Sequence, residues 1–293
     1  MAAGAANFIG RISGLIREMV FARVFGAGAV ADAFNVAYRV PNLLRELLAE
    51  GSLANVFVPI FAEEAEGHDP REGLRRAWAL ANAFLGLLLL VLGGVTLLFI
   101  VGSELFVYML ASGFSKDPDK AALAADLTEW MAPFLAGLSV ASLFGGMLNV
   151  RGKFFLPALA PSFLNFFVIA ACLLGDPWEA ATGLPHIHAI ALAATLSGFA
   201  TASVQYPALR AMGFRFRPNL RGHPEIRRIL KFMAASLIGI GVVQFNLLVE
   251  TQLASTYQDA DGPVSWLIYG FRLVQLPQTI VAGSVAVVAL AAL

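Results

Sequence analysis

Residues 84–101 read FLGLLLLVLGGVTLLFIV, a stretch without a charged side chain or a proline. A helix on the surface of a soluble protein shows a polar face on every turn, and this stretch has none. About 20 predominantly apolar residues allow a helix to cross the hydrocarbon core of a bilayer. The stretch therefore predicts a membrane-spanning helix within Ala77–Leu110.

Stretches of similar length lie on both sides of it. Toward the C-terminus they are Leu127–Leu148, Leu156–Leu174, Ile187–Met212, Ile229–Leu253 and Val264–Leu293, and toward the N-terminus two more highly charged ones are Phe8–Phe25 and Ala31–Phe61. The whole chain is 58% hydrophobic and 14% charged, with a mean hydropathy of +0.74, whereas soluble domains have about 45–50% and about 25%. We therefore predict an all-α polytopic membrane protein with about eight transmembrane helices. This composition excludes a disordered chain and disfavours a soluble enzyme.

Lysine and arginine are distributed unevenly between the loops of this eight-helix arrangement. One set of loops, within residues 63–76, 149–155 and 209–231, carries twelve of them, whereas the other set carries only Lys116 and Lys120. Cytoplasmic loops are enriched in these residues. The bias predicts a cytoplasmic N-terminus. Because Arg11 and Arg17 interrupt the apolar N-terminal stretch, we expect no signal peptide.

Several classes of function find no support in the chain. The net charge is zero, with 20 basic and 20 acidic residues, so the overall charge gives no reason to expect nucleic-acid binding. Cys172 is the only cysteine, and His186 and His188 have no further metal ligands beside them, so we expect no metal site. Phosphate-binding loops and catalytic triads are absent from the sequence. We expect neither a cofactor nor enzymatic activity, and transport must use a Na⁺ or H⁺ gradient, the membrane potential or the gradient of the substrate itself.

Six arginines fall inside the predicted spans: Arg11, Arg17, Arg23, Arg39, Arg45 and Arg272. Each arginine at the bilayer centre costs about 2.5–3.5 kcal/mol on insertion scales. Arg23 is near a helix end and can reach the interface. The other five are expected to face protein or a water-filled cavity.

Local ion pairs are one explanation for these arginines. Carboxylates lie seven positions from two of them, where a helix brings side chains to one face: Asp32 and Glu46 for Arg39, and Glu18 for Arg11. Arg17 and Arg45 have no partner at that spacing. Guanidinium groups bind phosphate and carboxylate in a bidentate manner. We therefore predict that some of these arginines bind an anionic lipid headgroup or an organic anion.

A family resemblance is carried by several short segments. They are Ser13–Glu18, Phe25–Gly28, Asp32–Phe34, Pro41–Arg45, Ala49–Gly51, Pro157–Pro161 with Asn165, and Val264–Tyr269 with Arg272 and Pro277. Together they resemble the MurJ (MviN) lipid II flippases of bacteria. Two positions depart from the pattern, because Glu46 stands where a basic residue is frequent and Phe271 where an acidic residue is frequent.

The resemblance implies a fourteen-helix, two-lobe transporter of the multidrug/oligosaccharidyl-lipid/polysaccharide exporter superfamily. Residues 1–215 would form the N-terminal lobe with helices one to six, and residues 216–293 the start of the C-terminal lobe. The implied activity is translocation of undecaprenyl-pyrophosphoryl-MurNAc-pentapeptide-GlcNAc, lipid II, across the bacterial cytoplasmic (inner) membrane by alternating access. The implied substrate-binding residues are Arg11, Arg17, Asp32, Arg39, Arg45 and Arg272.

Two alternatives remain open on the sequence alone. One is a related exporter of another lipid-linked saccharide or of a drug, although the arginines argue against a cationic substrate. The other is a non-transporting scaffold for cell-wall synthesis proteins, which are also possible partners of a flippase. A separate prediction concerns coupling: Asn246 and Glu250 lie four apart and share a helical face, so they are candidate ligands for Na⁺ or, for Glu250, a proton.

Overall fold

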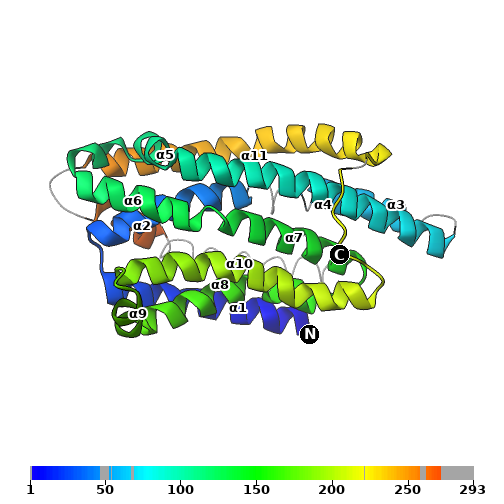
Figure 1. Cartoon of the computed structure of the whole chain (residues 1–293), viewed down its shortest axis with the longest axis horizontal. Coiled ribbons are helices and arrows are strands. Elements are labelled where there is room, and N and C mark those ends of the chain that lie inside the picture. The colour runs from blue at the N-terminus through cyan, green and yellow to red at the C-terminus, as the bar shows by residue number, and fades with distance from the viewer. Residues whose placement is uncertain are drawn as a thin grey trace, which may run out of the picture.

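The structure, a computed structural model, describes residues 2–46, 53, 55–66, 69–220, 222–257 and 262–271. Every regular element within these ranges is a helix, and the helices form one elongated bundle (Figure 1). The prediction of an all-α protein is therefore confirmed for the described part of the chain.

The helices follow the predicted spans closely. In chain order they are α1 (Ala2–Phe25), α2 (Ala29–Leu44), α3 (Val58–Ala65), α4 (Pro70–Val101), α5 (Ser103–Leu110), the short 3₁₀ helix η2 (Ser112–Lys116), α6 (Pro118–Met131), α7 (Phe134–Val150), α8 (Phe155–Leu173), α9 (Gly175–Thr182), α10 (His186–Ala211) and α11 (Pro224–Thr256). A further helical segment covers 263–271, at the start of the eighth predicted span. The helices α4, α6 and α11 begin in the same way. The side chain of the preceding residue, Asp69, Asp117 or His223, caps the helix, and a proline is the first helical residue.

Four segments of the described residues are long and apolar enough to cross a membrane: Arg71–Val101, Pro118–Val150, Phe155–Leu173 and His186–Ala211. Three predicted spans differ in detail from the structure, and one of them, Leu127–Leu148, includes the end of α6 and the start of α7. The span predicted within Ala77–Leu110 ends at Val101, and α5 follows after a turn at Gly102. The span predicted as Ala31–Phe61 is divided between α2 and α3.

The loops rich in lysine and arginine lie at one end of the bundle, and the loops with few of these residues lie at the other end. The turn between α1 and α2 lies at the end on the left of Figure 1. At this end Tyr269 donates a hydrogen bond to the carbonyl of Gly26 (3.0 Å), and the ring of Phe25 packs against His186. At the other end, the amide of Arg217 donates to Asn82 (2.8 Å). The predicted alternation of the helices is thus present, and the structure leaves the assignment of the cytoplasmic end as a prediction. We call the Gly26 end the exterior end below.

Small residues bring two pairs of helices close together. On α1, a Cβ added at Gly10 or Gly14 would lie 3.5 Å from side-chain atoms of α8. On α7, a Cβ at Gly137 would lie 2.7 Å from the backbone nitrogen of Phe199 on α10. The packing role expected of small residues in membrane helices therefore explains the α1–α8 and α7–α10 pairs.

Candidate functional site

A cavity of about 600 Å³ lies among α1, α2, α7, α8 and α10. Arg17 from α1 and Arg45 from the end of α2 both line it. Glu46, which follows Arg45, lines it too, and the remaining walls are neutral, with small apolar residues of α7 and polar residues such as Asn165 and Gln205 on α8 and α10. The cavity therefore has a charged side, with two arginines and one glutamate, and a neutral polar side. Such a combination suits an anionic ligand that carries hydrogen-bonding groups.

The two cavity arginines pair with the residue that follows each of them. Arg17 forms an ion pair with Glu18, and Arg45 contacts Glu46 at 3.4 Å while its Nε donates to Asn42 at 3.0 Å. The seven-residue spacing used on the sequence did not identify these partners. The suggested pairing of Arg11 with Glu18 is wrong in this conformation, because Glu18 accepts from Arg17 instead.

The other predicted substrate-binding arginines lie elsewhere. Arg11 is exposed on α1 and does not line the cavity. Arg39 joins α2 to α11, because its Nε donates to Thr251 (3.2 Å) and its guanidinium reaches the carbonyl of Leu247 (3.4 Å). Arg272 lies outside the described residues. The structure thus brings Arg17 and Arg45 together in this cavity and leaves Arg11 apart from them, whereas Arg39 lines a smaller neighbouring pocket together with Arg17.

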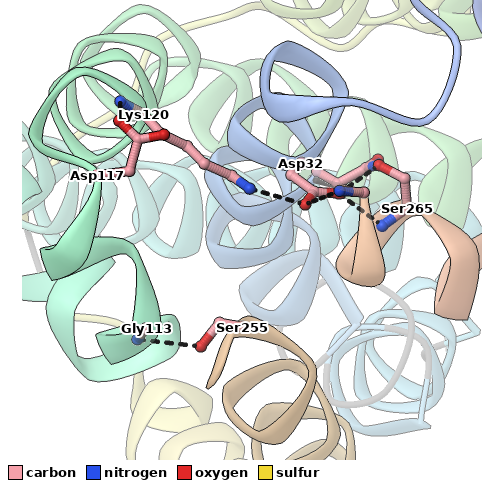
Figure 2. A network of polar contacts seen from close by, with 8 residues as sticks. Asp32, Gly113, Asp117, Lys120, Ser255 and Ser265 are labelled. Carbon is pink, nitrogen blue, oxygen red and sulfur yellow. Dashed lines mark hydrogen bonds and ion pairs between the residues drawn. The ribbon is translucent and has the colours of Figure 1, made fainter. Parts of the chain in front are cut away.

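Asp32, also predicted to contact substrate, is the centre of a buried polar network at the exterior end (Figure 2). Its side chain is fully buried. One carboxylate oxygen accepts from the ammonium group of Lys120 at 3.0 Å and from the amide of Gly262 at 3.1 Å. The other accepts from the amide and the hydroxyl of Ser265, at 2.8 and 2.6 Å. Asp32 therefore links α2, α6 and the segment 262–271, and it does not face the cavity.

A second set of contacts closes the same end. The amide of Gly113 donates to the hydroxyl of Ser255 at 3.3 Å (Figure 2). The side-chain amide of Gln252 makes two hydrogen bonds with Ser112. Its oxygen accepts from the backbone N–H at 3.0 Å, and its nitrogen donates to the hydroxyl at 2.5 Å. These bonds join η2 to α11. Together with the Asp32 network they connect the two predicted lobes away from the cavity.

The predicted ion ligands are adjacent on α11. Asn246 donates from its amide nitrogen to the Glu250 carboxylate at 2.8 Å, and Asn246 is exposed. Two residues before Asn246, Gln244 donates to Glu46 at 2.5 Å, so α11 also contacts the carboxylate beside Arg45. The ligand role of Asn246 and Glu250 stays a prediction.

The two histidines are not arranged as a metal site. His188 contacts the Asp126 carboxylate at 2.6 Å, and His186 contacts the carbonyl of Ala171 at 2.9 Å. Within the residues that the structure describes, no group of three or more potential ligands gathers. Both histidines instead link the first turn of α10 to its neighbours.

Reasoning from the sequence missed two important residues. Lys120 was counted as a loop residue, yet its side chain is buried against Asp32, 88 positions away. Gln205 was not singled out, although it is only 2% exposed and lines the cavity. The signal available for Gln205 was its place as a polar residue inside the apolar span Ile187–Met212.

Comparisons with known proteins agree with this architecture. A family model described as "Lipid II flippase MurJ" matches residues 21–293. A probable lipid II flippase MurJ of Rhizobium meliloti is 36% identical over 98% of this chain and 52% of its own length, and a lipid II flippase MurJ of Burkholderia cenocepacia is 35% identical over 98% and 55%. A solved structure titled "Lipid II flippase MurJ, inward closed conformation" has a TM-score of 0.77 at 22% identity, covering 94% of this chain and 54% of that one. This chain therefore spans about half the length of the relatives it matches.

Proposed function

The chain belongs to the MurJ family of lipid II flippases, and from this we propose that it is the N-terminal, eight-helix part of a longer flippase. In this proposal the protein moves lipid II, the undecaprenyl-pyrophosphate-linked disaccharide-pentapeptide, from the cytoplasmic to the outer leaflet of the bacterial inner membrane. The observation that carries the proposal is the cavity lined by both Arg17 and Arg45. Family membership favours this substrate over another lipid-linked saccharide or a drug.

The chemistry of the cavity supports a pyrophosphate ligand. Two guanidinium groups offer planar pairs of N–H donors that match phosphate oxygens. In this conformation Glu18 and Glu46 occupy those donors. A pyrophosphate that enters the cavity would replace these carboxylates, so the arginines exchange one anionic partner for another and are never left unpaired in an apolar setting.

Alternating access requires that the exterior contacts break when substrate leaves. The Asp32 network and the Gln252–Ser112 bonds hold the exterior end closed in this conformation. Residues of both predicted lobes take part, with residues 1–215 on one side and 216–293 on the other. Substrate would therefore enter from the opposite end, which we propose is cytoplasmic, together with the N-terminus. The twelve-to-two loop bias supports this orientation.

The transport step makes and breaks no covalent bond, so we propose a transporter and not an enzyme. The driving force would come from a Na⁺ or H⁺ gradient or from the membrane potential. We propose Asn246 and Glu250 as candidate ion ligands, because they are already bonded to each other and a carboxylate within a span marks a functional site by default. Cell-wall synthesis proteins are proposed partners, since they would use the delivered lipid II.

The experiment replaces Arg17 and Arg45 by alanine in the full-length protein and tests growth after depletion of the wild type. We expect each variant to be expressed and to lose complementation, and outer-leaflet lipid II to fall. Arg45→Lys should rescue poorly, because lysine cannot make the bidentate contact. Arg23→Ala is the matched control, because Arg23 is exposed near the end of α1 and should matter little. Full complementation by both alanine variants would refute the assignment.

A further inference from the structure

Gln205 is a buried amide whose hydrogen-bonding groups are unused. Its side chain is 2% exposed, and neither Oε1 nor Nε2 has a hydrogen-bond partner among the residues that the structure describes. A buried polar group without a partner costs its full desolvation penalty, and native proteins contain few such groups. Gln205 also lines the 600 Å³ cavity. The unused amide therefore lies where a ligand can supply the missing bonds.

The neighbouring polar residues on the same walls have their donors occupied. The amide nitrogen of Asn165 donates to the carbonyl of Gly10 (3.1 Å) and to the hydroxyl of Ser13 (3.0 Å), which ties α8 to α1. The hydroxyl of Thr201 donates to the carbonyl of Ser197 at 2.7 Å. These groups serve the packing of the helices. Gln205 stands out because both of its polar atoms remain available.

The space beside Gln205 is kept open by a glycine. A Cβ added at Gly145 would lie 3.4 Å from Oε1 of Gln205 and 3.4 Å from Pro157. This distance is tight for a Cβ contact, so a larger residue at Gly145 would press against the amide. The same helix contributes Gly146 and Ser142 to the cavity. Small side chains on α7 therefore leave the amide accessible to a ligand group.

We propose that Gln205 is a second recognition point in the cavity, one that binds a neutral amide of the substrate headgroup while the arginines bind the pyrophosphate. A primary amide carries both N–H donors and a C=O acceptor, so Gln205 can donate to the carbonyl of one headgroup amide and accept from the N–H of another. The headgroup offers such amides in its N-acetyl sugars and in its peptide. This inference rests on the proposed function, and it adds that the headgroup beyond the pyrophosphate is selected.

The test measures lipid binding to purified full-length protein with three ligands. They are undecaprenyl pyrophosphate, undecaprenyl pyrophosphate bearing the N-acetylated disaccharide without peptide, and complete lipid II. The variant is Gln205→Met, which keeps the length of the side chain and removes its hydrogen bonds. We expect the affinity for lipid II to fall about tenfold, equivalent to about 1.4 kcal/mol, and the affinity for undecaprenyl pyrophosphate to change less than about twofold. A loss already seen with the peptide-free lipid assigns the amide to the sugars, and a loss seen only with lipid II assigns it to the peptide.

The melting temperature without lipid separates recognition from a structural role. Gln205→Met removes no hydrogen bond that the structure shows, so we expect the melting temperature to stay the same or to rise. Ser139→Ala is the matched control: Ser139 is fully buried, its hydroxyl also has no partner among the described residues, and it does not line the cavity. It should leave the binding of all three lipids unchanged.

Two results would overturn the inference. One is an equal effect of Gln205→Met on all three lipids, and the other is a lower melting temperature with lipid binding unchanged. Failure of the proposed function gives a different result, because wild-type protein would then bind none of the three lipids. If wild type binds lipid II and Gln205→Met binds it equally well, only the role of Gln205 is lost.

Discussion

Neutralising Asp32 should open the exterior end of the protein. Asp32→Asn keeps the shape of the side chain but puts an NH₂ group in place of one carboxylate oxygen. In one orientation this group faces Lys120 and Gly262, and in the other it faces the two donors of Ser265. A donor therefore meets donors in both orientations, and Lys120, only 9% exposed, loses the carboxylate that it contacts.

The size of the effect follows from this burial. Removing one partner of a buried ion pair costs about 3–5 kcal/mol, because the remaining charge is left uncompensated. Opening the exterior end would expose Lys120 to water and relieve that cost. The penalty therefore falls mainly on the closed state. Since about 1.4 kcal/mol corresponds to tenfold in an equilibrium constant, the population of the open state should rise by about 100-fold or more.

Cysteine labelling measures this population. Ser255→Cys provides the reporter, because Ser255 is 7% exposed and sits at the closed end, while the native Cys172 is buried. A membrane-impermeant maleimide should label the reporter much faster in the Asp32→Asn background. Lys116→Met is the matched control, since Lys116 lies on η2 and is exposed. Adding Lys120→Met to Asp32→Asn should slow the labelling again, because the buried ammonium group that Asp32 contacts is then removed as well.

The reasoning is refuted if Asp32→Asn changes the labelling rate less than about twofold, or if Lys120→Met fails to reverse an increase. In either case the pair would not hold the closed state. A uniform loss of folded protein is distinguished by following the melting temperature of each variant in parallel.

The remaining predictions concern packing and coupling. Gly137→Ala should destabilise the protein by about 1–3 kcal/mol or more, because the new Cβ would lie 2.7 Å from the backbone of α10. Gly93→Ala is the control and should be neutral or slightly stabilising, because a Cβ at Gly93 meets nothing within 4 Å. Equal melting temperatures for the two variants would contradict this prediction. Glu250→Gln in the full-length protein should alter the dependence of transport on Na⁺ concentration or on pH. A wild-type response to both would make Glu250 structural.

The fold followed from the sequence wherever one helix supplied the whole signal. Uninterrupted apolar runs such as residues 84–101 indicate a span because the bilayer demands length and apolarity from each helix separately. The uneven distribution of lysine and arginine between the loops then indicated that successive loops lie at opposite ends of the bundle. Interruptions such as the turn at Gly102 were missed because the apolar composition continues through it into α5.

The candidate site was only partly predictable, because its contacts join distant parts of the chain. Spacing along one helix suggested Asp32 and Glu46 as partners for Arg39, but Asp32 contacts α6 and the segment 262–271, and Arg39 reaches α11. Arg17 and Arg45 could be selected as candidate binding residues because a charged side chain inside a membrane span is costly and is retained mainly where it has a function. The missing hydrogen bonds of Gln205 could not be predicted, because whether a polar side chain finds a hydrogen-bond partner depends on all of its neighbours in space.

The contacts at the two ends of the bundle differ in a way that bears on direction. At the exterior end, Asp32 and Lys120 are paired out of reach of water. At the opposite end, Arg228 on α11 contacts Glu63 at 2.7 Å with both side chains about half exposed, and hydrogen bonds from Arg228 to Glu63 and Glu225 raise its pKa. Exposed ion pairs contribute little because water solvates the separated charges well. We therefore expect this conformation to separate more easily at the Arg228 end, which is the end that the loop charges predict to be cytoplasmic.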